Sequence, residues 1–178
     1  MLRTHFEATS PGAIASLYVR LVSRKRLESR ASYTVLSVAL LVLVLDTVTK
    51  VWARHTLASH NIHVVSDLWL RLQYNAGISF SINKSGPLVT TILTTAITVL
   101  VAVIGLRSNR GAPAVGFGLL VGGGASNLID RLYESPHRVT DFVSFGSFPV
   151  FNLADASITI GFLILLVAMI RGERLLLR

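Results

Sequence analysis

Four apolar segments alternate with polar stretches along this chain of 178 residues. They cover residues 33–53, 87–106, 112–132 and 153–170. Each segment has close to the roughly 20 residues that a helix needs to cross the hydrocarbon core of a bilayer. The third segment is rich in Gly and Ala, which let neighbouring helices approach closely. The pattern predicts an all-α polytopic membrane protein with four transmembrane helices.

A different periodicity occurs in the loop of residues 54–86, between the first two spans. In "LWLRLQYN", residues 68–75, Leu68, Leu70 and Leu72 alternate with more polar neighbours, and this period of two is typical of a half-buried strand. The segment "AGISFSI", residues 76–82, is also β-prone and follows a Gly-containing turn. We expect a small extracytoplasmic β-sheet, or cradle, at the outer membrane interface, where Trp69 and Tyr74 suit the interfacial environment.

The composition agrees with a membrane protein. Apolar residues make up 52% of the chain and charged residues 15%, against roughly 25% charged residues in an average soluble protein. The chain has no cysteine, which excludes disulfides, a thiolate nucleophile and a Cys-ligated metal. The net charge of +8 is not accompanied by a nucleic-acid-binding motif, so we expect membrane lipid and no nucleic acid as its partner.

The basic residues indicate how the chain crosses the membrane. One set lies before the first span, between the second and third spans, and after the fourth span: Arg3, Arg20, Arg24, Lys25, Arg26, Arg30, Arg107, Arg110, Arg171, Arg174 and Arg178. Because cytoplasmic segments carry the excess of Lys and Arg, both termini are expected in the cytoplasm. The chain then divides into a mobile basic cytoplasmic N-terminal extension (1–32), a four-helix membrane domain (33–171) and a cytoplasmic tail (172–178). The first span is too long for a typical signal-peptide core and lacks a small-residue cleavage site, so we expect it to be retained.

With this topology, most of the polar residues next to the spans lie at one depth on the outer side of the membrane. Several are three or four positions apart in a predicted helix and therefore share a helix face. A random placement of structural charges would occupy both sides, so this arrangement indicates a site. Its members are Asp46, Lys50, Asn75, Asn127, Asp130, Arg131, Asp141, Asn152 and Asp155.

Structural explanations exist for most of these residues. Asp46 and Lys50 have the spacing of a helical acid–base pair, and Asp130 with Arg131 is compatible with an interfacial ion pair. Asp155 near a helix N-terminus gains roughly 0.3–1 kcal/mol from the helix dipole.

Of two further residues, one has a structural explanation and the other has none. Asn152 is a suitable cap for the helix that follows it. Asp141, in "VTDFV", has no helix end or adjacent cation in the sequence to account for it.

Two nearby carboxylates provide a chemistry that needs no other group. Close carboxyl groups share one proton, because both cannot ionise at low cost. One oxygen can then deprotonate water while the other carboxyl protonates the carbonyl of a peptide bond. No GxSxG motif occurs, and His137 has no second His at a metal-ligand spacing, so acyl-enzyme chemistry and a zinc site have little support.

Five ordered motifs resemble those of lipoprotein signal peptidase, or signal peptidase II. They are "LDTVTK", "NAGISF", "GGASNLIDRL", "VTDF" and "FNLAD", and together they extend from residue 45 to residue 155. Any one of these motifs alone would be a weak signal, whereas five in the order of the family are a strong one. The basic extension lies outside the resemblance.

The resemblance implies a membrane aspartic endopeptidase of the bacterial inner (cytoplasmic) membrane, with its active site on the outer side. Members of this family remove the signal peptide from diacylglyceryl-modified prolipoproteins, cutting just before the lipidated cysteine. The catalytic pair would be Asp141 and Asp155. The resemblance further implies no cofactor, no metal, inhibition by globomycin and action as a monomer. The supporting and substrate-binding residues would be Asn75, Asn127, Asp130, Arg131, Asn152, Asp46 and Lys50.

Two positions depart from the family pattern. Thr47 stands where Gln is usual, and Ser126 stands where Gly commonly precedes the Asn. Neither position belongs to the expected catalytic pair. Two other functions remain open at this point: a small ion- or proton-coupled transporter that uses the acidic residues as a pathway, and a non-catalytic assembly subunit.

Overall fold

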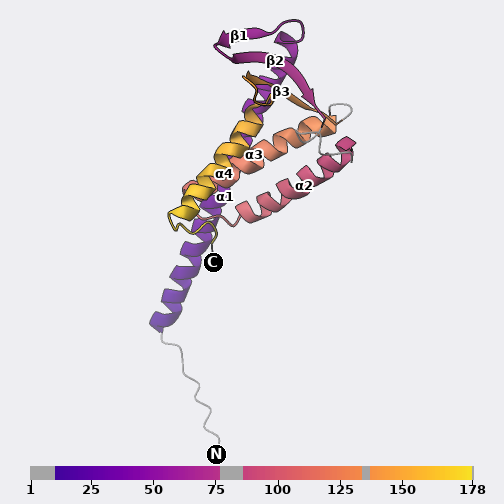
Figure 1. Ribbon diagram of the computed structural model, residues 1–178. Coiled ribbons are helices and arrows are strands. Elements are labelled where there is room, and N and C mark those ends of the chain that lie inside the picture. The colour runs from indigo at the N-terminus through magenta and orange to yellow at the C-terminus, as the bar shows by residue number, and fades with distance from the viewer. Residues whose placement is uncertain (1–10, 77–85, 134–136, 178) are drawn as a thin grey trace, which may run out of the picture.

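The computed structural model describes residues 11–76, 86–133 and 137–177. Four helices form a bundle, and a small sheet lies at one end of it (Figure 1). We call this the sheet end, and the opposite end, where the C-terminus lies, the tail end. In chain order the elements are α1 (Pro11–Thr56), β1 (Ile62–Val65), β2 (Leu68–Asn75), α2 (Gly86–Gly105), α3 (Ala112–Tyr133), β3 (Val139–Phe145) and α4 (Leu153–Ile170).

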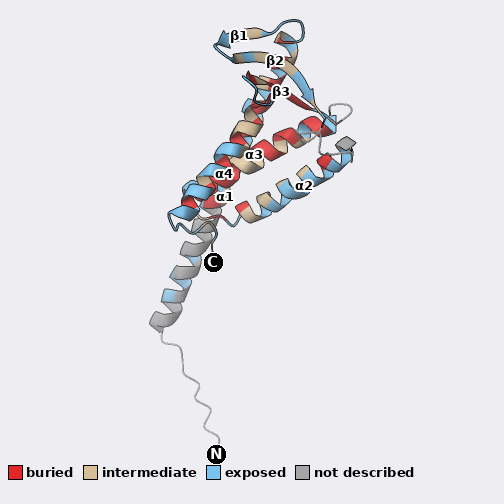
Figure 2. Cartoon of the chain, in the orientation of Figure 1, coloured by how far each residue is buried: buried red, intermediate tan, exposed pale blue. Residues whose placement is uncertain are grey.

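The four predicted spans are confirmed as helices. Residues Arg30–Thr56, Leu88–Gly105, Ala112–Tyr133 and Leu153–Ile170 are each long and apolar enough to cross a bilayer. Figure 2 shows in pale blue the exposed positions of these helices, and many of the residues at these positions are large and apolar. Since the described residues carry exposed Leu, together with Ile or Val, on all four helices, the chain is a multi-pass membrane protein with lipid-facing helix surfaces.

The first helix begins earlier than the sequence pattern suggests. Helix α1 starts at Pro11 and continues without interruption through the segment expected to be a mobile extension. A proline is well tolerated in the first turn of a helix, and residues 13–32 contain no further Pro or Gly that would break it. The basic segment from residue 11 onward is therefore a helical continuation of the first span.

Helix α3 is the central element of the bundle. It packs against α1, α2 and α4, and its small residues are buried, seen as the red stripe along α3 in Figure 2. A Cβ atom added to Gly122 would lie 2.7 Å from the carbonyl oxygen of Ala39 in α1, and one added to Gly123 would lie 2.5 Å from that of Ala154 in α4. Only glycine permits backbones to approach this closely, so the predicted role of the Gly-rich segment in helix packing is confirmed.

The sheet is antiparallel and has the order β1-β2-β3. Strand β2 covers the residues for which a strand was predicted, with the Leu side chains half-buried. The second predicted strand segment, "AGISFSI", lies largely outside the described residues. Strand β3 was not predicted: the segment around Asp141 was assigned to a loop, but it pairs with β2 along Leu68–Asn75.

The tail end is closed by the C-terminal segment. Leu176 forms a β-bridge with Ser108, and the backbone N–H of Leu177 donates to the carbonyl of Arg107, at 2.9 Å. The tail therefore packs on the connection between α2 and α3. These two basic segments, which the sequence analysis assigned to the same side of the membrane, lie together.

Candidate active site

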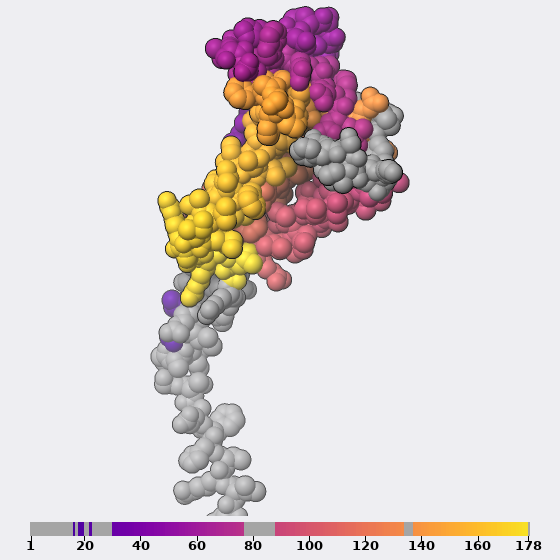
Figure 3. All heavy atoms as spheres, in the orientation of Figure 1, coloured from indigo at the N-terminus to yellow at the C-terminus, as the bar shows by residue number. Residues whose placement is uncertain are grey.

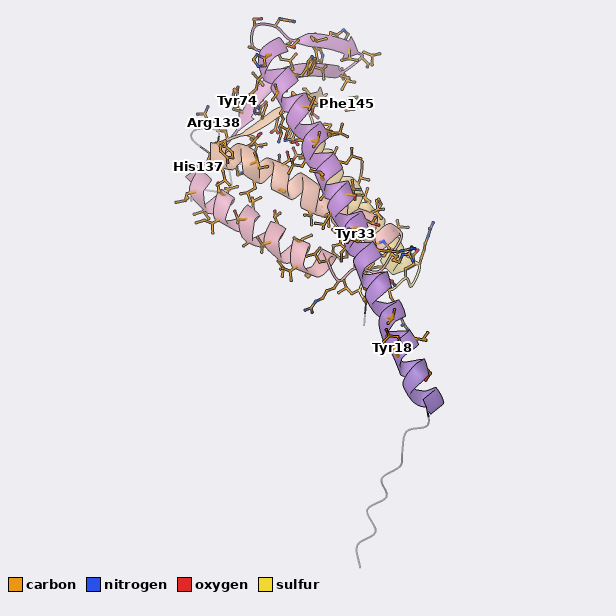
Figure 4. The ribbon with its side chains drawn as sticks, turned by 180° about the vertical axis from the view of Figure 1, so that it is seen from behind. Tyr18, Tyr33, Tyr74, His137, Arg138 and Phe145 are labelled. Carbon is orange, nitrogen blue, oxygen red and sulfur yellow. The ribbon has the colours of Figure 1, made fainter. Side chains whose placement is uncertain are left out.

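All nine residues of the predicted site lie at the sheet end, and hydrogen bonds or ion pairs connect them. They come from α1, α3, β3 and α4, with Asn75 at the end of β2. Figure 4 shows the edge of this region: Tyr74, His137 and Arg138 lie near one another beside the end of α3, far from Tyr18 on α1.

Asn127 is at the centre of the network. Its Oδ1 accepts from Lys50 Nζ at 2.9 Å and from Asn152 Nδ2 at 3.1 Å. Its own Nδ2 donates to Asp155 Oδ1 at 2.8 Å. A side-chain amide has one acceptor oxygen and one donor nitrogen, and here both have partners, which fixes the orientation of the amide. Asn127 therefore sets the position of the Asp155 carboxylate relative to α1.

Asn152 caps α4 and also contacts the second carboxylate. Its side chain accepts from the backbone N–H of Asp155 at 2.9 Å, and Asp155 Oδ2 accepts from the backbone N–H of Asn152 at 3.2 Å, which forms a capping box. The Nδ2 of Asn152 donates to Asp141 Oδ1 at 2.7 Å. Asn152 thus caps α4 as its position suggests, and the same residue contacts both acids, Asp141 through its side chain and Asp155 through its backbone N–H.

Asp46 and Lys50 form the ion pair that their spacing suggests, but both have further partners. Lys50 Nζ lies 2.7 Å from Asp46 Oδ2 and 3.2 Å from Asp130 Oδ2. Asp46 Oδ1 accepts from the backbone N–H of Ala154 at 2.8 Å, and its Oδ2 accepts from Ser126 Oγ at 2.7 Å. The pair is fully buried and joins α1 to the start of α4 and to α3.

Ser126 accounts for one of the departures from the family pattern. Its hydroxyl lies beside Asp46 and donates a hydrogen bond to Oδ2 of this buried carboxylate. The approach of α3 to α1 is therefore compatible with a serine here. The other departure, Thr47, is exposed and lies outside the network.

Asp130 holds strand β3 in place. Its Oδ2 accepts from the backbone N–H of Thr140 at 2.8 Å, and its Oδ1 lies 3.8 Å from Arg54 Nη1. Arg54 Nη1 also donates to Thr140 Oγ1 at 3.0 Å. The ion-pair partners of Asp130 are thus on α1. Because Asp141 follows Thr140 directly, the hydrogen bond from Thr140 to Asp130 also places Asp141. Sequence reasoning missed Arg54 and Thr140, because no motif connects positions so far apart in the chain.

Arg131 is a buried cation close to the acids. Its side chain donates from Nη1 to the carbonyl of Asn127 at 3.3 Å, and its Nε has no hydrogen-bond partner among the described residues. Its positive charge interacts with three nearby carboxylates, those of Asp155, Asp141 and Asp130. His137 Nδ1 donates to the carbonyl of Arg131 at 2.8 Å and so satisfies the end of α3.

A β-bulge in β2 directs Asn75 to Asp141. Leu70 pairs with Val143 and Gln73 with Asp141, so β2 has one residue more than β3 between these pairs. The alternation of buried and exposed positions changes there: Tyr74 becomes exposed and Asn75 half-buried. Bulges commonly redirect a side chain beside an active site, and the Asn75 side chain hydrogen-bonds Asp141.

The environment of Asp141 favours its protonated form. Burial and, to a smaller extent, the nearby charge of Asp155 together raise the pKa of the Asp141 carboxyl to about 7. Hydrogen bonds from Asn75 and Asn152, and the charge of Lys50, act in the opposite direction. Asp141 can therefore be protonated near neutral pH, as a general acid must be.

The site has no evident place for a metal ion. Within the part of the chain that the structure describes, no three His, Asp or Glu side chains are grouped as metal ligands. What the arrangement offers instead is two carboxyl groups that both accept from Asn152, one from its side-chain amide and one from its backbone N–H, with a buried cation nearby.

Comparisons with known proteins identify the family of this chain. The family model for Signal peptidase (SPase) II matches residues 38–171. The lipoprotein signal peptidase of Mycobacterium leprae (strain Br4923) is 35% identical over 144 residues, covering 77% of this chain and 71% of the relative. That of Chlorobium phaeobacteroides (strain BS1) is 36% identical over 146 residues, covering 72% of this chain and 91% of the relative.

Two solved structures have a similar fold. One is a bacterial membrane enzyme determined by the in meso method at 2.3 Å resolution, with a TM-score of 0.66 and 27% identity, covering 78% of this chain and 88% of that chain. Another, at 1.9 Å resolution, has a TM-score of 0.67 and 28% identity, covering 76% and 92%. The chain belongs to the signal peptidase II family, whose members are peptidases that remove signal peptides from prolipoproteins.

Proposed function

We propose that this protein is an aspartic endopeptidase in which Asp141 and Asp155 act as the catalytic pair. The observation that carries the proposal is that Asn152 contacts the carboxyl groups of both residues: its side-chain Nδ2 donates to Asp141 and its backbone N–H donates to Asp155. Two carboxyl groups in such proximity hold one proton between them. We assign this proton to Asp141, whose pKa is raised to about 7 by burial and by the nearby charge of Asp155.

The reaction follows from this charge state. Ionised Asp155 takes a proton from a water molecule, whose oxygen attacks the carbonyl carbon of the peptide bond. Protonated Asp141 gives its proton to the carbonyl oxygen, which produces a neutral diol. Asp155 then returns a proton to the amide nitrogen, the C–N bond breaks, and a diol hydroxyl returns its proton to Asp141. Both carboxyl groups end in their starting states, so the pair acts as a general acid and base.

The other polar residues orient this pair. The two carboxyl groups accept hydrogen bonds from three amides, those of Asn127, Asn152 and Asn75. The ion pair of Lys50 and Asp46 holds α1 against the start of α4. Arg131 is a cation near the point where negative charge develops, and we assign it, with Asp130, to holding the substrate backbone and the site.

The substrate is a prolipoprotein that carries diacylglyceryl on the cysteine after the cut. Its acyl chains and signal helix keep it in the bilayer, and a peptide bond held near the interface reaches a site at the sheet end without leaving the membrane. We assign the protein to the bacterial inner membrane, with both termini in the cytoplasm, the sheet end outside, and activity as a monomer. Residues 1–32 and 172–178 lie outside the catalytic machinery.

A cleavage assay tests the catalytic assignment. The full chain in detergent is mixed with a diacylglyceryl-modified prolipoprotein, and the shorter product is followed by gel electrophoresis. Asp141→Asn and Asp155→Asn are each expected to lower turnover by at least about 1,000-fold. Asp67→Asn, at an exposed turn between β1 and β2, is the matched control and should leave turnover unchanged.

Four results would contradict the proposal. Turnover retained by either variant removes that residue from the catalytic pair. Loss of activity with a chelator alone points to a metal-dependent reaction, and no effect of globomycin argues against the family's substrate site. A fully active Asp141→Asn variant that remains associated with other lipoprotein-processing proteins would favour the non-catalytic subunit.

A further inference from the structure

An apolar groove runs along α4 from the catalytic pair toward the tail end. The part near the sheet end has a volume of about 340 Å³, and Phe148, Asp155 and Thr159 are among the residues that line it. The part near the tail end has a volume of about 330 Å³ and is lined in part by Val167 and Arg171. Ile160 lines both parts, which places them end to end on α4. We call this surface the α4 groove.

The α4 groove opens sideways toward the membrane. The side chains of Ile160, Leu163 and Val167 are 51%, 49% and 43% exposed, although they lie in a helix long and apolar enough to cross the bilayer. Figure 3 shows α4, in yellow, on the outside of the molecule. A molecule that fills the groove can therefore enter from within the bilayer and reach Asp155 directly.

The proposed substrate has two apolar parts that could occupy such a groove: the acyl chains on its cysteine and the helix of its signal peptide. From Asp155 to Arg171 the groove follows α4 for about 24 Å, at roughly 1.5 Å per residue. An acyl chain in the outer leaflet reaches only about half of the roughly 30 Å hydrocarbon core. A signal-peptide core of 7–15 apolar residues reaches up to roughly 22 Å as a helix. The length of the groove therefore matches the peptide.

We propose that the α4 groove is the docking surface for the apolar helix of the substrate's signal peptide. The proposal rests on the proposed function. Ala156 and Thr159 are small side chains next to Asp155, so a helix can approach α4 closely just before the cut. Phe148 and Phe151, whose ring centroids lie 5.8 Å apart in an edge-to-face arrangement, border the groove where the peptide must leave the helical conformation.

The tail end of the α4 groove carries both signs of charge. Glu173 is exposed there and complements the positive segment that precedes the apolar core of a signal peptide. Arg171 lines the same part of the groove and has the opposite effect. Apolar length, rather than charge, therefore determines how the peptide is placed, and Glu173 contributes to its orientation.

Cross-linking tests this placement, because the chain has no cysteine of its own. Ile160→Cys and Val167→Cys are made in the Asp141→Asn background, which retains the substrate, and the prolipoprotein receives single cysteines along its apolar core. Cross-links are expected from Ile160→Cys to substrate positions near the cut, and from Val167→Cys to positions about two turns earlier. Leu40→Cys on α1, at a position 63% exposed to lipid, is the matched control and should cross-link at least about tenfold less.

Kinetics provide an independent measurement. Ile160→Trp fills the groove and is expected to raise KM by about tenfold with little change in kcat, since it weakens binding and leaves the catalytic pair intact. Leu40→Trp should change neither value. A variant that merely misfolds would instead lose kcat, and its melting temperature would show this.

The outcomes separate the inference from the proposed function. If the wild-type chain cleaves the substrate but cross-links at Ile160→Cys and Leu40→Cys are equally weak, the α4 groove does not bind the signal peptide, and lipid alone covers it. If a photoreactive acyl chain on the substrate labels the groove and the peptide probes do not, the acyl chains are the occupant and the inference is wrong. If the wild-type chain cleaves nothing, the proposed function itself fails.

Discussion

At the scale of single residues, burial and hydrogen bonds determine the charge state of the proposed catalytic pair. Asn75 hydrogen-bonds the Asp141 side chain and so favours its ionised form, against the burial that raises its pKa to about 7. Asn75→Ala should raise this pKa further, because the ionised form loses a donor while burial is unchanged. The alkaline limb of the kcat profile should then move to higher pH.

This shift is measured as the pH dependence of kcat for both proteins in the same detergent. Val65→Ala, at an exposed position of β1, is the control and should keep the parent profile. An alkaline limb that stays at the same pH in Asn75→Ala would mean that Asp141 is not the group that must carry the proton.

Asp141 also affects stability in a way that depends on pH. Burial raises its pKa from 3.8 to about 7, so the folded chain binds a proton more tightly than the unfolded chain. Its contribution to stability is therefore fully present below about pH 4 and is lost as the pH rises through about 7. Asparagine resembles the protonated acid at every pH. Asp141→Asn should have a higher melting temperature than the parent at about pH 8, and the difference should narrow as the pH falls below 7.

Asp67→Asn serves as the comparison for this thermal unfolding measurement, because Asp67 is exposed. A constant difference between Asp141→Asn and the parent at all pH values would show that Asp141 is ionised throughout. That result would assign the shared proton to Asp155.

Seven of the nine site residues could be predicted from sequence because each lies near the end of an apolar segment, whereas Asn75 and Asp141 lie in strands between the spans. Once the spans are located, their ends on one side of the membrane are known, and the polar residues there must be close. The contacts of Arg54 with Thr140 and of Ser126 with Asp46 could not be predicted in this way. They depend on how far α1 extends and on which face it turns toward α3, and the apolar pattern specifies neither.

At the scale of elements, the contact between α3 and α4 determines where Asp155 lies. Gly123 touches the backbone of Ala154, one residue before Asp155, and a methyl group there would lie 2.5 Å from a carbonyl oxygen. Gly123→Ala should therefore displace the first turn of α4 and lengthen the Asn127–Asp155 hydrogen bond, which is 2.8 Å. We expect kcat to fall by at least about tenfold and the chain to lose about 1–3 kcal/mol of stability.

Turnover and thermal unfolding of Gly123→Ala measure the two effects. Ala96→Val, at an exposed position of α2, adds bulk without touching α4 and should change neither. Full activity of Gly123→Ala would indicate that the start of α4 can shift without disturbing the catalytic pair.

The strands illustrate what an element's sequence cannot specify alone. Strand β2 was predicted because one face is half-buried and its period is two. Strand β3 is buried on both faces over its first four residues, so it has no such period, and its strand conformation depends on pairing with β2. The bulge that turns Asn75 toward Asp141 likewise exists only in the paired sheet.

For the whole molecule, the direction of insertion determines which compartment the site faces. The basic C-terminal segment and the α2–α3 connection lie together at the tail end, and the catalytic pair lies at the sheet end. Because Lys and Arg remain in the cytoplasm, the sheet end should be outside. Single cysteines in the cysteine-free chain test this through labelling with a membrane-impermeant maleimide. Ser147→Cys, exposed after β3, should react in intact spheroplasts, and Arg174→Cys only after permeabilisation. The reverse pattern would place the catalytic pair in the cytoplasm, where a translocated prolipoprotein could not reach it.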